Sequence, residues 1–204
     1  SRGLGDVYKR QQLLDKLRGH WMYVPVVLSV FYGLRRSEVL GLQWGSVDFE
    51  NKSITIQHTR IYGDSDGTDA VIERDILKRK SSYRTLPIPE TVWTLLYNLK
   101  TVRCGEAPAP ADAYVCLNRE GEPVAPNYFT QCFKQFLRDN DLREIRLHDL
   151  RHTCASVLIQ NRVPLIEVQQ WLGHSTLETT ADLYAHLEYL SLIHISEPTR
   201  PRLI

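Results

Sequence analysis

Two short segments place arginine and histidine side chains beside expected helix starts. GLRRSE (33–38) holds an arginine pair, and HDLRH (148–152) holds His148 and Arg151, which share one helix face because they are three residues apart. Asp149 is the expected N-cap of that helix. A helix N-terminus adds partial positive charge and free backbone N–H groups, so this arrangement predicts an anion site. The plainer alternatives are a solvated arginine pair and a capped helix with surface charges.

A third segment, GHSTLETTADLYAH (173–186), carries His174 and Tyr184 ten residues apart. Ser175 followed by Glu178 has the spacing of a capping box, and a second, weaker start signal follows four residues later. One straight helix would separate His174 from Tyr184 by about 15 Å, at about 1.5 Å per residue. A break between helical turns would return both side chains toward one point. An ordinary amphipathic helix with a surface tyrosine is the alternative.

These residue types favour chemistry on a phosphodiester without a metal ion. The sequence has no H-E-x-x-H motif, no suitably spaced acid pair beside these segments and no Walker glycine loop. Metal-dependent nucleases and nucleoside-triphosphate chemistry are therefore disfavoured. Arginines bind non-bridging phosphate oxygens through charge-assisted, often bidentate hydrogen bonds. A tyrosine hydroxyl is a competent nucleophile when another group accepts its proton.

The elements that must position these residues form a mostly helical α+β domain with one small antiparallel three-stranded sheet. Helices are expected over residues 12–33 (ending at Gly33), 35–44, 89–100, 127–140, 148–161, and from Pro164 to Gly173. Strands are expected in a hairpin over 47–59, in AVIERDILK (70–78) and in YRTLPIP (83–89), the last two flanking a charged turn at 78–82. Segments 63–69 and 105–113 are expected to be loops.

Length and composition fit one globular domain. The chain has 204 residues, 43% hydrophobic and 24% charged, which is enough for a core of its own. The four cysteines are widely spaced, so they predict neither a zinc site nor a disulfide framework and fit a reducing cytosol. There is no run of 18 apolar residues and no recognisable signal peptide, so we expect no membrane partner.

The two ends of the chain differ from the rest. GDVYKRQ (5–11) and LSLIHISEPTRPRLI (190–204) resemble translated sequencing-adapter sequence, so residues 1–11 and 190–204 are predicted to be artefactual tails. Genuine disordered tails are the alternative. Without both segments the net charge falls from +1 to −2, with 20 basic and 22 acidic residues. Nucleic-acid binding would therefore have to come from local clusters of cations.

Four motifs together resemble the catalytic domain of the tyrosine recombinases, or phage integrases. In chain order they are GLRRSE, LKRKSSYRTLPIP, LHDLRHTCASVL and WLGHSTLETTADLYAH. Each is modest evidence alone, and four in the family's order are strong evidence. Residues 12–189 are therefore identified as such a domain, and they look most like integrases of conjugative transposons and related mobile elements of Gram-positive-type bacteria.

The resemblance assigns catalytic roles to Arg35, Lys78, His148, Arg151, His174 and Tyr184. The family's lysine lies on a hairpin turn of variable length, so Lys80 stays open as the alternative to Lys78. Glu38 matches an acidic residue with a structural role. Trp171 lies within the WLGH motif and is expected in the core.

The resemblance implies a transesterification that needs neither cofactor nor metal. Tyr184 attacks the scissile phosphate, forms a 3′-phosphotyrosyl link and releases a 5′-hydroxyl. Lys78 protonates the leaving oxygen, and His148 accepts the tyrosine proton. The two arginines and His174 stabilise the pentavalent transition state. The 5′-hydroxyl of a second strand then attacks the phosphotyrosine.

The implied partner is double-stranded DNA, bound by a homotetramer of the full-length protein in the bacterial cytoplasm, at the nucleoid. The family's DNA-clamping domain and its protomer-docking segment are not recognisable in this sequence, so we expect this chain alone to be monomeric. Two other classes stay open. A type IB topoisomerase-like enzyme would relax supercoils without strand exchange, and a non-catalytic DNA-binding relic would form no covalent DNA adduct.

Overall fold

The computed structural model describes residues 7–65, 68–75, 83–178 and 180–181. Its helices are α1 (Val7–Leu17), α2 (Tyr23–Tyr32), α3 (Arg36–Leu40), α4 (Glu90–Cys104), α5 (Pro126–Asp139), α6 (Leu147–Gln160) and α7 (Leu165–Leu172), with a 3-10 turn at Trp44–Ser46. Its strands are β1 (Val47–Asp48), β2 (Ser53–Ile56), β3 (His58–Ser65), β4 (Thr68–Asp75) and β5 (Arg84–Pro87). The predicted α+β class with a small three-stranded antiparallel sheet is confirmed.

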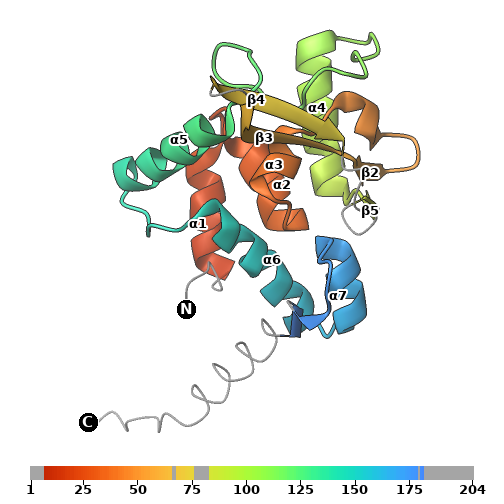
Figure 1. Ribbon diagram of the computed structural model, residues 1–204, viewed down its shortest axis with the longest axis vertical. Coiled ribbons are helices and arrows are strands. Elements are labelled where there is room, and N and C mark those ends of the chain that lie inside the picture. Colours follow the sequence, from red (N-terminus) through yellow and green to blue (C-terminus); the bar gives the residue numbers. More distant parts are fainter. Residues whose placement is uncertain (1–6, 66–67, 76–82, 179, 182–204) are drawn as a thin grey trace, which may run out of the picture.

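Helix α2 is the centre of the domain, with α6 on one side of it and the strands and α4 on another (Figure 1). It packs against α1, α3, α4 and α6. Its apolar sequence YVPVVLSVFY leaves seven of ten residues buried. Burying an aliphatic or aromatic side chain contributes about 1.5–3 kcal/mol, so this helix is the main anchor for the elements that carry the arginines. No helix in the described part of the chain is long and apolar enough to cross a membrane.

The three-stranded sheet has the order β1-β2-β5, all antiparallel. Ile54 of β2 lies opposite Val47 on one side and Leu86 on the other, so the apolar side chains of the three strands share one face. The predicted hairpin over 47–59 is confirmed in β1 and β2. In β5, alternation places Arg84 and Leu86 on the buried face and Thr85 on the exposed face.

A separate ribbon of β3 and β4 corrects two expectations. The segment 63–69 is not a loop, because strand pairing continues to Ser65 opposite Thr68. Strand β4 pairs with β3 and not with β5, although the sequence places 70–78 and 83–89 around one charged turn. The polar composition of 63–69 favours turns, and for that reason a loop is predicted there. Antiparallel strands that are joined by a short connection can nevertheless stay paired close to it.

Two predicted helix ends are confirmed, and two predicted helices are wrong within their bounds. Gly33 and Gly173 end α2 and α7 in the left-handed conformation, with φ of 61° and 68°, as predicted. The segment 12–33 is not one helix, because Gly19 (φ 77°) follows α1 in a tight turn before α2 begins. Helix α1 begins at Val7, inside the predicted tail; the boundary at residue 11 stays a prediction.

The second failure concerns 35–44, where the helix ends at Leu40. Gly41 lies against strand β3, and a Cβ atom there would come within 2.7 Å of the Thr59 Cα atom. The chain therefore turns at Gly41 and continues into the 3-10 turn that leads to β1.

Candidate active site

The start of α3 fixes the base of Arg35. The Glu38 carboxylate accepts a hydrogen bond from the Arg35 backbone N–H at 2.9 Å and another from Arg35 Nη1 at 2.7 Å. Glu38 is 2% exposed, whereas the Arg35 side chain is 37% exposed. Arg35 Nη2 also donates to the Gly173 carbonyl at 2.9 Å. The guanidinium is thus held from two sides and still open to solvent.

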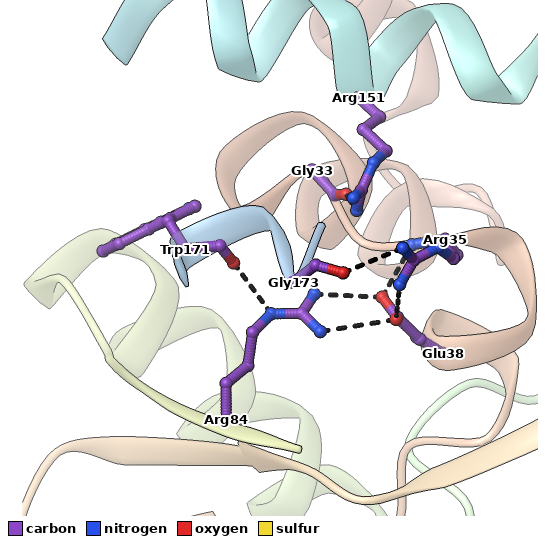
Figure 2. Close-up of polar contacts among 7 residues, drawn as sticks. All are labelled: Gly33, Arg35, Glu38, Arg84, Arg151, Trp171 and Gly173. Atoms are coloured by element: carbon purple, nitrogen blue, oxygen red, sulfur yellow. Dashed lines mark hydrogen bonds and ion pairs between the residues drawn. The ribbon is translucent and has the colours of Figure 1, made fainter. Parts of the chain in front are cut away.

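A second arginine, Arg84 of β5, meets the same carboxylate (Figure 2). Its Nη1 and Nη2 lie 3.3 and 3.0 Å from the two Glu38 oxygens, and its Nε donates to the Trp171 carbonyl at 2.7 Å. Sequence reasoning did not single out Arg84. The available signal was an arginine on the apolar face of a strand in YRTLPIP, a position that needs a buried partner.

The third arginine, Arg151, extends from α6 and is 3% exposed. Its Nη1 donates to the Gly33 carbonyl at 2.7 Å, while its buried Nη2 has no hydrogen-bond partner among the described residues. Burial, together with the neighbouring charge of Arg35, lowers the pKa of Arg151 to about 9, so it is still a cation at pH 7. Buried donors are nearly always paired, so this one indicates an anion-binding position.

The predicted N-cap of α6 is wrong. The N-cap is Arg146, and Asp149 is the third helical residue. The Asp149 carboxylate accepts the Arg146 backbone N–H at 2.8 Å and pairs with Arg146 Nη2 at 2.9 Å. An acid three residues after an arginine therefore caps both α3 and α6. This cap keeps the first turn of α6 in place and leaves His148 partly exposed beside it.

The two predicted histidines have different environments. His174 follows the end of α7, and its Nδ1 lies 2.9 Å from Thr180 Oγ1. Burial and the positive charges of Arg151 and Arg35 lower its pKa to about 4, so it is neutral at pH 7. His148 stacks edge-on against His152 with ring centroids 4.7 Å apart, and partial burial with its neighbours His152 and Arg151 lowers its pKa.

The segment after His174 starts its helix later than the sequence indicates. Helical backbone begins at Glu178, and the Leu177 carbonyl accepts the N–H groups of Thr180 and Ala181 at 2.9 and 2.8 Å. The predicted cap at Ser175 is therefore two residues too early. Tyr184, Lys78 and Lys80 lie outside the described residues. The structure thus brings together Arg35, Arg151 and His174, with His148 on the same helix as Arg151.

The electrostatics of this cluster favour an anion. Burial raises the pKa of Glu38, but Arg84 and Arg35 outweigh that effect and hold it below the ordinary value, so Glu38 is ionised. One carboxylate then faces three guanidinium groups, counting Arg151. Excess positive charge in a partly buried place, together with an Arg151 donor that has no partner among the described residues, favours binding of an anion such as phosphate.

A groove of about 700 Å³ lies beside Arg35, between β3 and the N-terminal end of α6. Its charged lining residues are Arg35, Arg36, Arg60, Lys134 and Arg146, with His148 at the same wall. No acidic side chain lines it in the described part of the chain. Arg36 is tied to α5, because its Nη1 donates to Thr130 Oγ1 at 2.7 Å. The groove therefore extends the positive surface away from the arginine cluster.

The geometry defines this protein as an α+β domain with an arginine-rich candidate anion site. The chain matches the Phage integrase family over residues 10–190 and therefore belongs to that family. It is 28% identical over 189 residues to a XerC-like tyrosine recombinase of Caldanaerobacter subterraneus subsp. tengcongensis, covering 87% of this chain and 48% of that protein. It is 31% identical over 183 residues to the ICEBs1 integrase of Bacillus subtilis, covering 85% and 46%. The chain spans about half the length of these relatives.

Solved structures share the fold. The Tn1549 transposon integrase in complex with transposon right end DNA superimposes with a TM-score of 0.73 at 22% identity, covering 94% of this chain and 65% of that one. The XerA recombinase superimposes with a TM-score of 0.70 at 19% identity, covering 97% and 65%. The helical arrangement around α2 and the small sheet is therefore that of these recombinases.

Proposed function

We propose that this chain is the catalytic domain of a tyrosine-type site-specific DNA recombinase that breaks and rejoins DNA without a metal ion. The observation that carries the proposal is the buried, unpaired Nη2 of Arg151 in the arginine cluster, considered among the described residues. A buried guanidinium donor without a partner is costly, so this one favours an anionic ligand there. Membership of the phage integrase family makes a DNA phosphodiester the favoured ligand.

Within this proposal the two arginines with unused donors hold the scissile phosphate. Arg35 and Arg151 bind its non-bridging oxygens and stabilise the charge that grows in the pentavalent transition state. His174 is neutral and can donate from Nε2 when Nδ1 accepts the Thr180 hydroxyl. Neutral His174 therefore adds a hydrogen bond to the phosphate without adding to the crowded positive charge.

The remaining roles come from the family motifs. Tyr184 is the nucleophile that forms the 3′-phosphotyrosyl link, and His148 accepts its proton. The lowered pKa of His148 keeps it unprotonated at neutral pH, as a proton acceptor must be. Lys78 protonates the 5′-oxygen that leaves.

The groove beside Arg35 is proposed to follow the DNA backbone next to that phosphate. The integrase of Tn1549 with the same fold is described in complex with its transposon end DNA, which supports duplex DNA as the partner. The full-length protein would act as a homotetramer on DNA in the bacterial cytoplasm, at the nucleoid, and this chain alone would be a monomer. Light scattering with and without DNA measures that assembly.

A nicked suicide substrate tests the proposed reaction. The chain is expected to form a protein–DNA adduct that survives SDS, and Tyr184→Phe is expected to form none while keeping its melting temperature. Tyr97→Phe is the matched control, because Tyr97 is an exposed tyrosine on α4. Undiminished adduct in Tyr184→Phe would contradict the nucleophile. Supercoil relaxation without strand exchange would favour a topoisomerase. If the parent chain formed no adduct, the alternative of a non-catalytic DNA-binding protein would remain.

A further inference from the structure

We propose that Arg84 is a positioning residue for strand cleavage. It keeps Arg35 turned toward the phosphate by occupying Glu38, and it fixes the end of α7 that carries His174. This inference rests on the proposed function. Arg84 is 8% exposed, so it acts through its contacts inside the protein and not on the DNA directly.

The Glu38 carboxylate is shared between Arg35 and Arg84. One carboxylate oxygen accepts Arg35 Nη1 at 2.7 Å and Arg84 Nη1 at 3.3 Å. The other accepts the Arg35 backbone N–H at 2.9 Å and Arg84 Nη2 at 3.0 Å. Each oxygen therefore has two donors, which fills its lone pairs. Arg84 takes the part of the carboxylate that Arg35 would otherwise claim.

Arg35 keeps part of its guanidinium donors for a phosphate. A guanidinium has about five N–H donors. Among the described residues the side chain uses one toward Glu38 and one toward the Gly173 carbonyl. The others remain for a phosphate, which takes a bidentate pair. Without Arg84, the buried Glu38 charge would lose one of its two cations and draw Arg35 inward into a bidentate pair, because a buried unpaired charge is costly.

Arg84 also contacts the C-terminal end of α7. Arg84 Nε donates to the carbonyl of Trp171, in the last turn of α7. Two residues later Gly173 ends the helix in the left-handed conformation, and His174 follows. Arg84 thus bonds to the acid that orients Arg35 and to the helix end that carries His174 (Figure 2). It sets the distance between two proposed phosphate ligands through its contacts with Glu38 and Trp171.

The test measures the rate of adduct formation on a nicked suicide substrate at saturating DNA and low salt, with the DNA dissociation constant measured separately. Arg84→Gln is expected to slow adduct formation about 10- to 100-fold and to leave the dissociation constant within about 3-fold, as expected for residues coupled through one network. Arg138→Gln is the matched control, since Arg138 pairs with Glu144 on the exposed side of α5 and its loss removes the same charge.

A double-variant cycle separates positioning from plain structural support. If Arg84 acts through Arg35, then Arg35→Ala combined with Arg84→Gln cleaves within about 3-fold of Arg35→Ala alone. Rate losses that multiply would overturn the action through Arg35, and an Arg84→Gln variant that cleaves like the parent would overturn the whole inference. If Arg84→Gln melts below the assay temperature, Arg84→Lys decides. It keeps the cation beside Glu38 but loses the two-pronged geometry, so it is expected to be folded and slow, and full activity would overturn the inference.

Failure of the proposed function looks different. In that case the parent chain itself forms no adduct, whatever stands at position 84. If the parent and the Arg84→Gln variant form adduct at the same rate, only the role of Arg84 is rejected.

Discussion

Arg151 Nη1 donates a hydrogen bond of 2.7 Å to the carbonyl oxygen of Gly33, although the two residues are 118 positions apart. The bond joins the end of α2 to α6. Gly33 can present its carbonyl this way because its φ of 61° turns the chain out of the helix. An added Cβ atom there would lie 2.5 Å from Leu172 Cδ2 and 3.2 Å from Cys154 Cβ. One glycine therefore sets the junction of α2, α6 and α7.

Gly33→Ala is expected to lower the free energy of unfolding by more than the ~1–2 kcal/mol that a left-handed alanine costs by itself. The excess comes from the contact with Leu172, which has to shift. Urea denaturation measures the change. Gly19→Ala is the control, because Gly19 also has positive φ (77°) but nothing within 4 Å of the added Cβ. Equal losses in the two variants would show that the contact is without consequence.

Arg151→Ala is expected to slow adduct formation by about 10²–10³-fold while changing DNA affinity much less. Loss of a preorganised donor to transition-state charge has this size, and DNA affinity depends on many phosphate contacts. Single-turnover cleavage and a filter-binding titration at the same salt concentration measure the two effects. A variant that cleaves at the parent rate once DNA is saturating would make Arg151 a backbone clamp.

The melting temperature of the DNA-free chain is expected to fall as the pH is lowered from 7 toward 5. The pKa of His174 is about 4 in the folded state, below its ordinary value of about 6.5, so the unfolded chain binds the extra proton first. Its contribution to stability is therefore complete above pH 6.5 and is lost as the pH falls toward 4. The lowered pKa values of His148 and His20 act in the same direction. His174→Gln is expected to flatten this dependence, and a slope equal to that of the parent would contradict the assignment.

Lys78→Ala is expected to lose cleavage of an ordinary phosphodiester and to regain it on a substrate with a 5′-bridging phosphorothiolate. A thiolate leaves without needing a proton, so it bypasses a missing general acid. The same pair of substrates is to be run on Lys80→Ala. Rescue of that variant in place of Lys78→Ala would transfer the role to Lys80.

Lys134→Ala is expected to weaken DNA binding and to reduce the slope of log affinity against log salt by about 1, as loss of one phosphate contact does. Lys134 is exposed on α5 at the wall of the groove. Lys100→Ala is the comparison, since Lys100 lies over the rings of Phe49 and Tyr97 outside that groove. An unchanged slope in Lys134→Ala would place the duplex elsewhere.

Helix ends and a tight hairpin could be predicted from the sequence, because each depends on a few neighbouring residues. Glycine after an apolar run predicted the ends of α2 and α7, and alternation around a polar turn predicted the hairpin of β1 and β2. The break after α1 depends on a single glycine in a polar stretch and gives little signal. The partner of β4 could not be predicted, because pairing is decided by which strand lies beside it in space.

The same distinction holds for the site. Arg35, Arg151 and His174 could be named from short motifs and from the family that those motifs resemble. Arg84 and Glu38 are 46 positions apart, and no local pattern connects a strand residue to a helix residue at that distance. The roles of Lys78 and Tyr184 remain predictions from sequence, since both lie outside the described residues.

The Nη2 donor of Arg151, which has no partner among the described residues, also has a consequence for protein engineering. An apolar side chain of similar size would cost less to bury in the free protein than this cation does, so a redesign scored on thermal stability alone would replace it. The same redesign would keep Arg35, because its guanidinium is hydrogen-bonded to Glu38 and to the Gly173 carbonyl. Stabilisation of this domain should therefore hold Arg151 fixed and look for improvement elsewhere, because the phosphate contact proposed for this position is gained at the expense of robustness.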